Sequence, residues 1–130
     1  MTAVTITNPG LDGVSAVKGG LMISGLFAGE ALAKGSAVYI KNDGLVYLAV
    51  STATEATNVA AFAGLVERAY AAGDPVTIFG QGNTFQLSTS LTPGALLYVS
   101  ATAGSLDSAK IASSDTPKAK CISTTSVVIL

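Results

Sequence analysis

The segment AGEALAKGSAVYIKNDGLVYLAV, residues 28–50, decides the fold because its pattern is that of a β-hairpin. β-prone residues fill Ala37–Lys41 and again Leu45–Val50. Between these runs lies Asn42-Asp43-Gly44, and an Asp-Gly pair favours a tight hairpin turn because both residues tolerate a positive φ angle. The segment therefore predicts two antiparallel strands joined by a short turn.

The chain repeats this pattern in its second half. Gly35–Ile40 corresponds to Gly94–Val99, where apolar residues again surround a tyrosine, and the glycine of the first turn corresponds to Gly104. Later in each copy, Lys118–Ser123 matches Ala63–Arg68 and Val127–Leu130 matches Val76–Phe79. Two similar units, each a hairpin plus two strands, are therefore predicted at about residues 26–80 and 85–130. Because the two units can bury their apolar faces on each other, we expect one all-β domain over residues 26–130, a compact β-barrel or sandwich.

An extended N-terminal arm is predicted before this domain, over residues 1–25. Thr2–Thr7 alternates apolar and polar side chains, as a short strand with one buried face does. Asn8-Pro9-Gly10 and several further glycines then break this pattern. Two interpretations stay open for the arm: a flexible terminus, or a segment that grips a neighbouring subunit.

Three further features have two interpretations each. Residues 53–70 contain alanines that suit a helix, but their apolar residues are poorly spaced for one, and we predict a strand at Ala61–Ala69. Gly80–Asn83 has some features of a phosphate-binding loop, but it lacks the third glycine and the following helix, so a hairpin turn is favoured. The tyrosine face of the hairpin, with Tyr39 and Tyr47, either packs internally, as we favour, or meets a partner.

The composition argues against nucleic-acid and membrane partners. Apolar residues make up 49% and charged residues 12% of the chain, and the formal net charge is −1. Such a chain offers no electrostatic footprint for nucleic acid and no basic cluster for a membrane surface, whereas a weakly charged surface suits a lasting protein contact. Lys118 and Lys120 form the one close basic pair, which we interpret as a solvated sheet edge rather than a partner site.

The sequence predicts no enzyme, no cofactor and no metal site. Histidine is absent, so the commonest general base and metal ligand is missing. Most of the acidic residues stand at predicted turns, and a converging carboxylate pair for glycoside hydrolysis is not evident. Cys121 is the only cysteine, which prevents an internal disulfide, and we interpret it as a small apolar side chain within a strand.

Two long segments resemble bacteriophage structural proteins. The pattern of residues 28–50, followed by FAGLVERAYAAGDPVTIFGQG at residues 62–82, is similar to small capsid cement (decoration) proteins. The second half, LTPGALLYVSATAGSLDSAKIASSDTPKAKCISTTSVVIL at residues 91–130, resembles β-modules of phage head and fibre proteins. The likeness covers about residues 26–130, and its segments consist mostly of strand and turn residues.

This resemblance implies a structural virion protein that is made in the host cytoplasm and binds the outer surface of the mature capsid. It implies a homotrimer that bridges neighbouring major capsid protein subunits. Two alternatives stay open: a fibre or tail module that binds another structural protein or a host-surface glycan, and a small hydrolase or lyase on a β-barrel. The cement hypothesis assigns capsid contact to the arm residues Val4, Ile6, Asn8 and Leu11, and a face of the trimer to Tyr39, Tyr47 and Tyr98.

Overall fold

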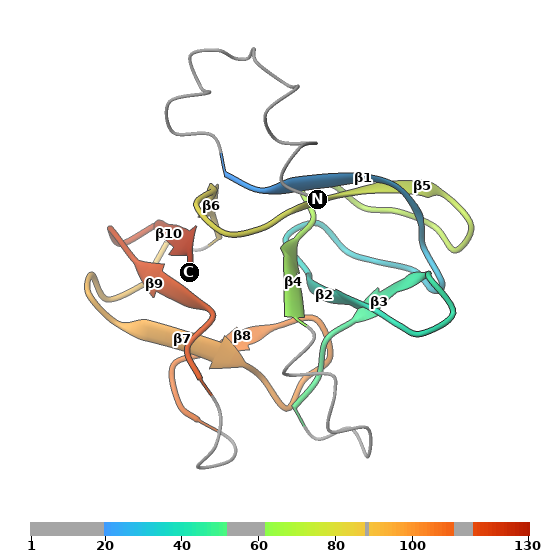
Figure 1. The fold of residues 1–130 in the computed structure, drawn as a ribbon. Coiled ribbons are helices and arrows are strands. Elements are labelled where there is room, and N and C mark those ends of the chain that lie inside the picture. The colour runs from blue at the N-terminus through green and yellow to red at the C-terminus, as the bar shows by residue number, and fades with distance from the viewer. Residues whose placement is uncertain (1–19, 52–61, 88, 111–115) are drawn as a thin grey trace.

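The computed structural model describes residues 20–51, 62–87, 89–110 and 116–130 (Figure 1). All regular elements in these ranges are β-strands, and they form two antiparallel sheets of five strands each. The all-β fold predicted from the sequence is therefore confirmed for these ranges. Most of the predicted arm lies outside the described residues, and so does the first part of the segment that suited either a helix or a strand.

Each half of the chain supplies one sheet. The first unit contains β1 (Met22–Phe27), β2 (Ala37–Ile40), β3 (Val46–Leu48), β4 (Phe62–Leu65) and β5 (Pro75–Phe79). The second unit contains β6 (Thr84–Gln86), β7 (Leu96–Val99), β8 (Leu106–Asp107), β9 (Ala119–Cys121) and β10 (Ser126–Ile129).

The two sheets have the same topology. Their strand orders are β1-β5-β4-β2-β3 and β6-β10-β9-β7-β8, so each strand of the first unit has a counterpart at the same place in the second. This agrees with the two similar units that the sequence predicted. Each unit has one strand more than the predicted hairpin and two strands, because β1 and β6 add an edge strand beside β5 and β10.

One kind of turn recurs between the strands, and it explains the spacing of several glycines. In Thr92-Pro93-Gly94-Ala95 the Ala95 N–H donates to the Thr92 carbonyl at 3.0 Å, and Gly94 has a φ of +88°. Proline fixes the φ of the second turn residue, and glycine accepts the positive φ that the third requires. The same hydrogen bond and positive-φ glycine occur in residues 33–36, 71–74, 80–83 and 102–105.

The turn at Gly80–Asn83 is therefore a tight turn, as favoured, but it is not a hairpin. It joins β5 of the first sheet to β6 of the second. The Asn83 side-chain amide donates to the carbonyls of Leu21 and Gly80 at 2.8 and 3.0 Å, which fixes this crossing. The turn is thus the covalent link between the two units.

The strand predicted at Ala61–Ala69 is shorter in the structure, where β4 ends at Leu65. The next residues pair with the segment before β2: the Val66 N–H donates to the Ser36 carbonyl at 3.2 Å, and Leu32 and Tyr70 form an isolated antiparallel bridge. The chain therefore continues past Leu65 in the register of the β2–β4 pairing, and the regular ladder stops because residues 33–36 form a tight turn.

The first unit has a hydrophobic core of its own. The buried cluster lies on one face of its sheet. The sheet curves so that the residues after β1 reach the opposite edge strand β3, where the Gly29 N–H donates to the Val46 carbonyl at 2.8 Å. This curvature gives the first unit the character of a small barrel. The buried cluster consists of Ala28, Leu32, Val38, Val46, Val66, Tyr70, Val76 and Ile78.

A second core lies between the two units (Figure 1). The first sheet contributes its other face, and the second sheet contributes the inward residues of β7, β9 and β10. Gly104 joins the units as well, since its carbonyl accepts from the Ala37 N–H and its N–H donates to the Ala49 carbonyl, both at 2.8 Å. Within the described ranges, the first sheet is thus covered on both faces and the second on one. The fully buried members of this core include Ala37, Ala49, Leu65, Val99, Ala119 and Val127.

Candidate functional site

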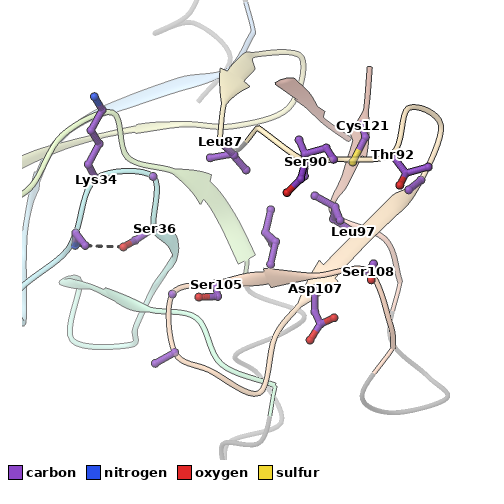
Figure 2. A pocket seen from close by; sticks show the side chains of 17 residues that line it. Lys34, Ser36, Leu87, Ser90, Thr92, Leu97, Ser105, Asp107, Ser108 and Cys121 are labelled. Carbon is purple, nitrogen blue, oxygen red and sulfur yellow. Dashed lines mark hydrogen bonds between the residues drawn. The ribbon is translucent and has the colours of Figure 1, made fainter. Parts of the chain in front are cut away.

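A groove of about 740 Å³ runs between the two units (Figure 2). Its wall on the first unit is the turn Ala33–Ser36, where the Ser36 hydroxyl accepts from the Ala33 N–H at 3.1 Å. Apolar side chains and the Cys121 thiol line the part formed by the second unit, and serine hydroxyls and Asp107 complete the lining. In Figure 2 the Lys34 and Asp107 side chains lie far apart, so the two charged side chains that line the groove do not form a catalytic pair.

Cys121 is buried at this groove, with 1% of its surface exposed, as expected for a small apolar side chain within a strand. A buried thiol reacts only when the structure around it opens. We expect Cys121 to react with a disulfide reagent such as dithionitrobenzoate at least about 100-fold more slowly in the native protein than in urea. Absorbance at 412 nm measures both rates, and equal rates would show that the groove leaves the thiol accessible.

The hairpin tip carries the best-defined polar cluster of the described residues. The Tyr47 hydroxyl donates to Asp43 Oδ2 at 2.7 Å, and the Leu45 N–H donates to Asp43 Oδ1 at 2.9 Å. The Lys41 ammonium lies 5.0 Å from the centre of the Tyr47 ring. The hydrogen bond from Leu45, followed by that from Tyr47, lowers the pKa of Asp43, and the hydrogen bond to Asp43 raises the pKa of Tyr47.

These shifts predict how Asp43 responds to pH. Because its pKa is lower in the folded than in the unfolded chain, its contribution to stability is present above the unfolded pKa and disappears as the pH falls through the folded one. We expect Tyr47→Phe to raise the folded pKa of Asp43, since one of the two donors to its carboxylate is lost. An NMR titration of the Asp43 carboxyl carbon in both proteins measures the change, and an unaltered midpoint would contradict the role of Tyr47.

The three tyrosines assigned to a trimer face occupy different environments. Tyr39 is buried, with 6% of its surface exposed, and its ring centre lies 6.2 Å from that of Tyr47 across β2 and β3. Internal packing, the favoured interpretation of this face, therefore holds for Tyr39, which is not available to a partner. Tyr98 lies on β7 of the other sheet, where the Lys110 ammonium is 5.9 Å from its ring centre. The structure thus separates Tyr98 from the other two.

None of the described core residues packs on the other side of the second sheet, and we call this side the outer face. On β7 and β9, Leu96 pairs with Lys120, and Lys120 in turn pairs with Val128 of β10. Leu96, Ile122 and Leu130 have 39%, 51% and 46% of their surfaces exposed, and they are three of the four exposed large apolar side chains among the described residues. The outer face consists of Leu96, Tyr98, Asp107, Lys118, Lys120, Ile122, Val128 and Leu130.

The sequence identified only part of this surface. It singled out Tyr98 and the pair Lys118 and Lys120, but it did not connect them with the exposed apolar residues. Alternation along β7 and β10 was the available signal, because every second residue of these strands is buried. The other predicted contact residues, Val4, Ile6, Asn8 and Leu11, lie outside the described residues.

Comparisons with known proteins assign no family to the chain. No protein-family model matches the sequence, and no curated protein matches it at a significant level. Within the described ranges, no group of three or more His, Cys, Asp or Glu side chains is placed to hold a metal ion. The same residues include no helix long and apolar enough to cross a membrane.

Proposed function

We propose that the chain is a structural virion protein that binds the outer surface of a mature phage capsid and bridges neighbouring major capsid protein subunits. The observation that carries the proposal is the outer face, which leaves three large apolar side chains exposed on a sheet whose other side packs against the first unit. Exposed apolar residues that gather on one face among polar ones mark protein contact surfaces.

Two further properties support a cement role. The two packed cores make a stiff body, and stiffness is what a protein needs to hold neighbouring subunits at a fixed spacing. The low share of charged residues, 12%, lets such a surface approach a neighbour closely at little desolvation cost. Weak contacts are sufficient on a capsid, because a bridging protein that holds two subunits at once gains from effective concentration.

Copy number tests this proposal. Quantitative mass spectrometry of purified virions gives the ratio of the chain to the major capsid protein. We expect a ratio near one, or a simple fraction of one, since a cement protein occupies every equivalent lattice position. A handful of copies per particle would favour a fibre or tail module instead, and the absence of the chain from virions would overturn the virion assignment.

The arm and the trimer are parts of the same proposal. On this proposal, Val4, Ile6, Asn8 and Leu11 contact the capsid, so deletion of residues 2–12 should reduce capsid occupancy while the unfolding midpoint of the protein stays unchanged. Unaltered occupancy would remove the arm from the proposal. The mass of the purified protein in solution, compared with the 12.9 kDa of one chain, tests the homotrimer.

A further inference from the structure

The internal repeat indicates that the outer face is a contact surface. In the first unit the face equivalent to it contains Ala37, Tyr39 and Leu65, which are almost completely buried against the second unit. By strand order and register, the equivalents of these residues are Leu96, Tyr98 and Lys120. One copy of this face is therefore a packed contact surface within the chain, and the other copy has no covering element among the described residues.

Two arrangements of a second copy on this surface are unfavourable. Within the chain, the face of the first sheet that is equivalent to the outer face packs on the inward side of the second sheet. A second copy that bound the outer face in the same way would therefore need a sheet whose inward side is free. The inner side of the first unit is filled by its own core, and that of the second unit is filled by the first. A face-to-face copy would place Lys118 and Lys120 against the same lysines, and like charges at a close contact are destabilising.

The charges of the outer face point to a partner of the opposite sign. Lys120 is exposed between Leu96 and Val128, and within the described ranges its ammonium takes part in no ion pair or side-chain hydrogen bond. Lys110 and Lys118 flank the same apolar residues, so the lysines here outnumber the carboxylate of Asp107, which lies opposite Tyr98 and accepts from the Ala109 N–H at 3.2 Å. A lysine that is covered during docking needs a carboxylate beside it, because an unpaired buried charge is costly.

We infer that the outer face docks on a protein surface that is apolar at its centre and carries carboxylates opposite Lys118 and Lys120. The inference rests on the proposed function, in which that surface belongs to the major capsid protein. The exposed apolar side chains provide the contact area, and the lysines set the orientation and the choice of partner.

Charge reversal tests this inference on capsids assembled without the chain. We expect Lys120→Glu to bind such capsids about tenfold more weakly than the wild type in a sedimentation assay, because a favourable charge pair becomes a repulsive one. Lys34→Glu is the matched control: it makes the same charge change at an exposed lysine of the first unit and should alter binding by less than about twofold. Unchanged unfolding midpoints show that both variants fold.

Zero-length cross-linking identifies the partner groups directly. A carbodiimide joins an ammonium to a carboxylate that touches it, and mass spectrometry of the bound wild type should find Lys118 or Lys120 linked to Asp or Glu of the major capsid protein. Links only through Lys34 or Lys41, or equal binding by Lys120→Glu and wild type, would overturn the docking face while leaving the cement function intact. Failure of the wild type to bind capsids would overturn both.

Discussion

Replacement of Gly64 by alanine is expected to destabilise the protein strongly. Gly64 has a φ of +152°, a conformation that residues with a side chain rarely adopt. A β-carbon at this position would also collide with the backbone carbonyl of Phe79 on the neighbouring strand β5, and backbone atoms within a sheet cannot move aside. We expect a loss of about 3–4 kcal/mol in the free energy of unfolding, measured by urea titration.

Gly73→Ala is the matched control for this prediction. Gly73 also has a positive φ, +91°, but no atom lies within 4 Å of the position of an added β-carbon. The substitution therefore introduces only the conformational cost, about 1–2 kcal/mol. Equal losses for the two variants would show that the contact between β4 and the Phe79 carbonyl does not constrain Gly64.

Leu65→Ala is expected to have an effect of similar size for a different reason. Leu65 is fully buried in the core between the two units, and its removal leaves a cavity that the surrounding strands fill only in part. We expect a loss of about 2–5 kcal/mol in the free energy of unfolding. Because this core contains residues of both units, tyrosine fluorescence and circular dichroism should report one common transition in the variant, at a lower urea concentration.

Leu96→Ala provides the comparison on the other copy of the same face. Leu96 is 39% exposed on the outer face, so its truncation should change the free energy of unfolding by less than about 0.5 kcal/mol. Two separate unfolding transitions in Leu65→Ala would contradict a core shared by both units. Equal losses in the free energy of unfolding for Leu65→Ala and Leu96→Ala would contradict the view that the face of the first unit is packed while that of the second is exposed.

Local signals in the sequence were sufficient for the fold class. Asp-Gly in the first hairpin and Pro-Gly before β7 specify turns through the φ angles of two residues, and the strands on either side alternate in the expected way. The end of β4 was not predictable in the same way. After Leu65 the chain keeps its register beside the segment that leads into β2, and the strand ends because the tight turn at residues 33–36 of that segment interrupts the ladder. The end of β4 is therefore set by a segment about 30 residues away in the sequence.

The candidate surface was harder to predict than the fold. Tyr39 and Tyr98 occupy equivalent positions in similar sequences, but one is buried and the other lies on the outer face. The difference comes from which unit lies against which, and no property of either tyrosine or its neighbours specifies that. The sequence does differ at one informative pair of equivalent positions, where the first unit has Leu65 and the second has Lys120. Because lysine is almost never fully buried, this difference indicates that the face of the second unit is exposed.

The unequal distribution of the two cores has a consequence for synthesis. The described residues of the first unit's core lie between residues 23 and 78, so this core is complete as soon as that length has left the ribosome. The second unit shares its core with Ala37, Tyr39 and Leu65 of the first, and these are already in place when its strands emerge. We therefore expect the first half to fold before the second, whose strands then pack against the surface of the folded first half.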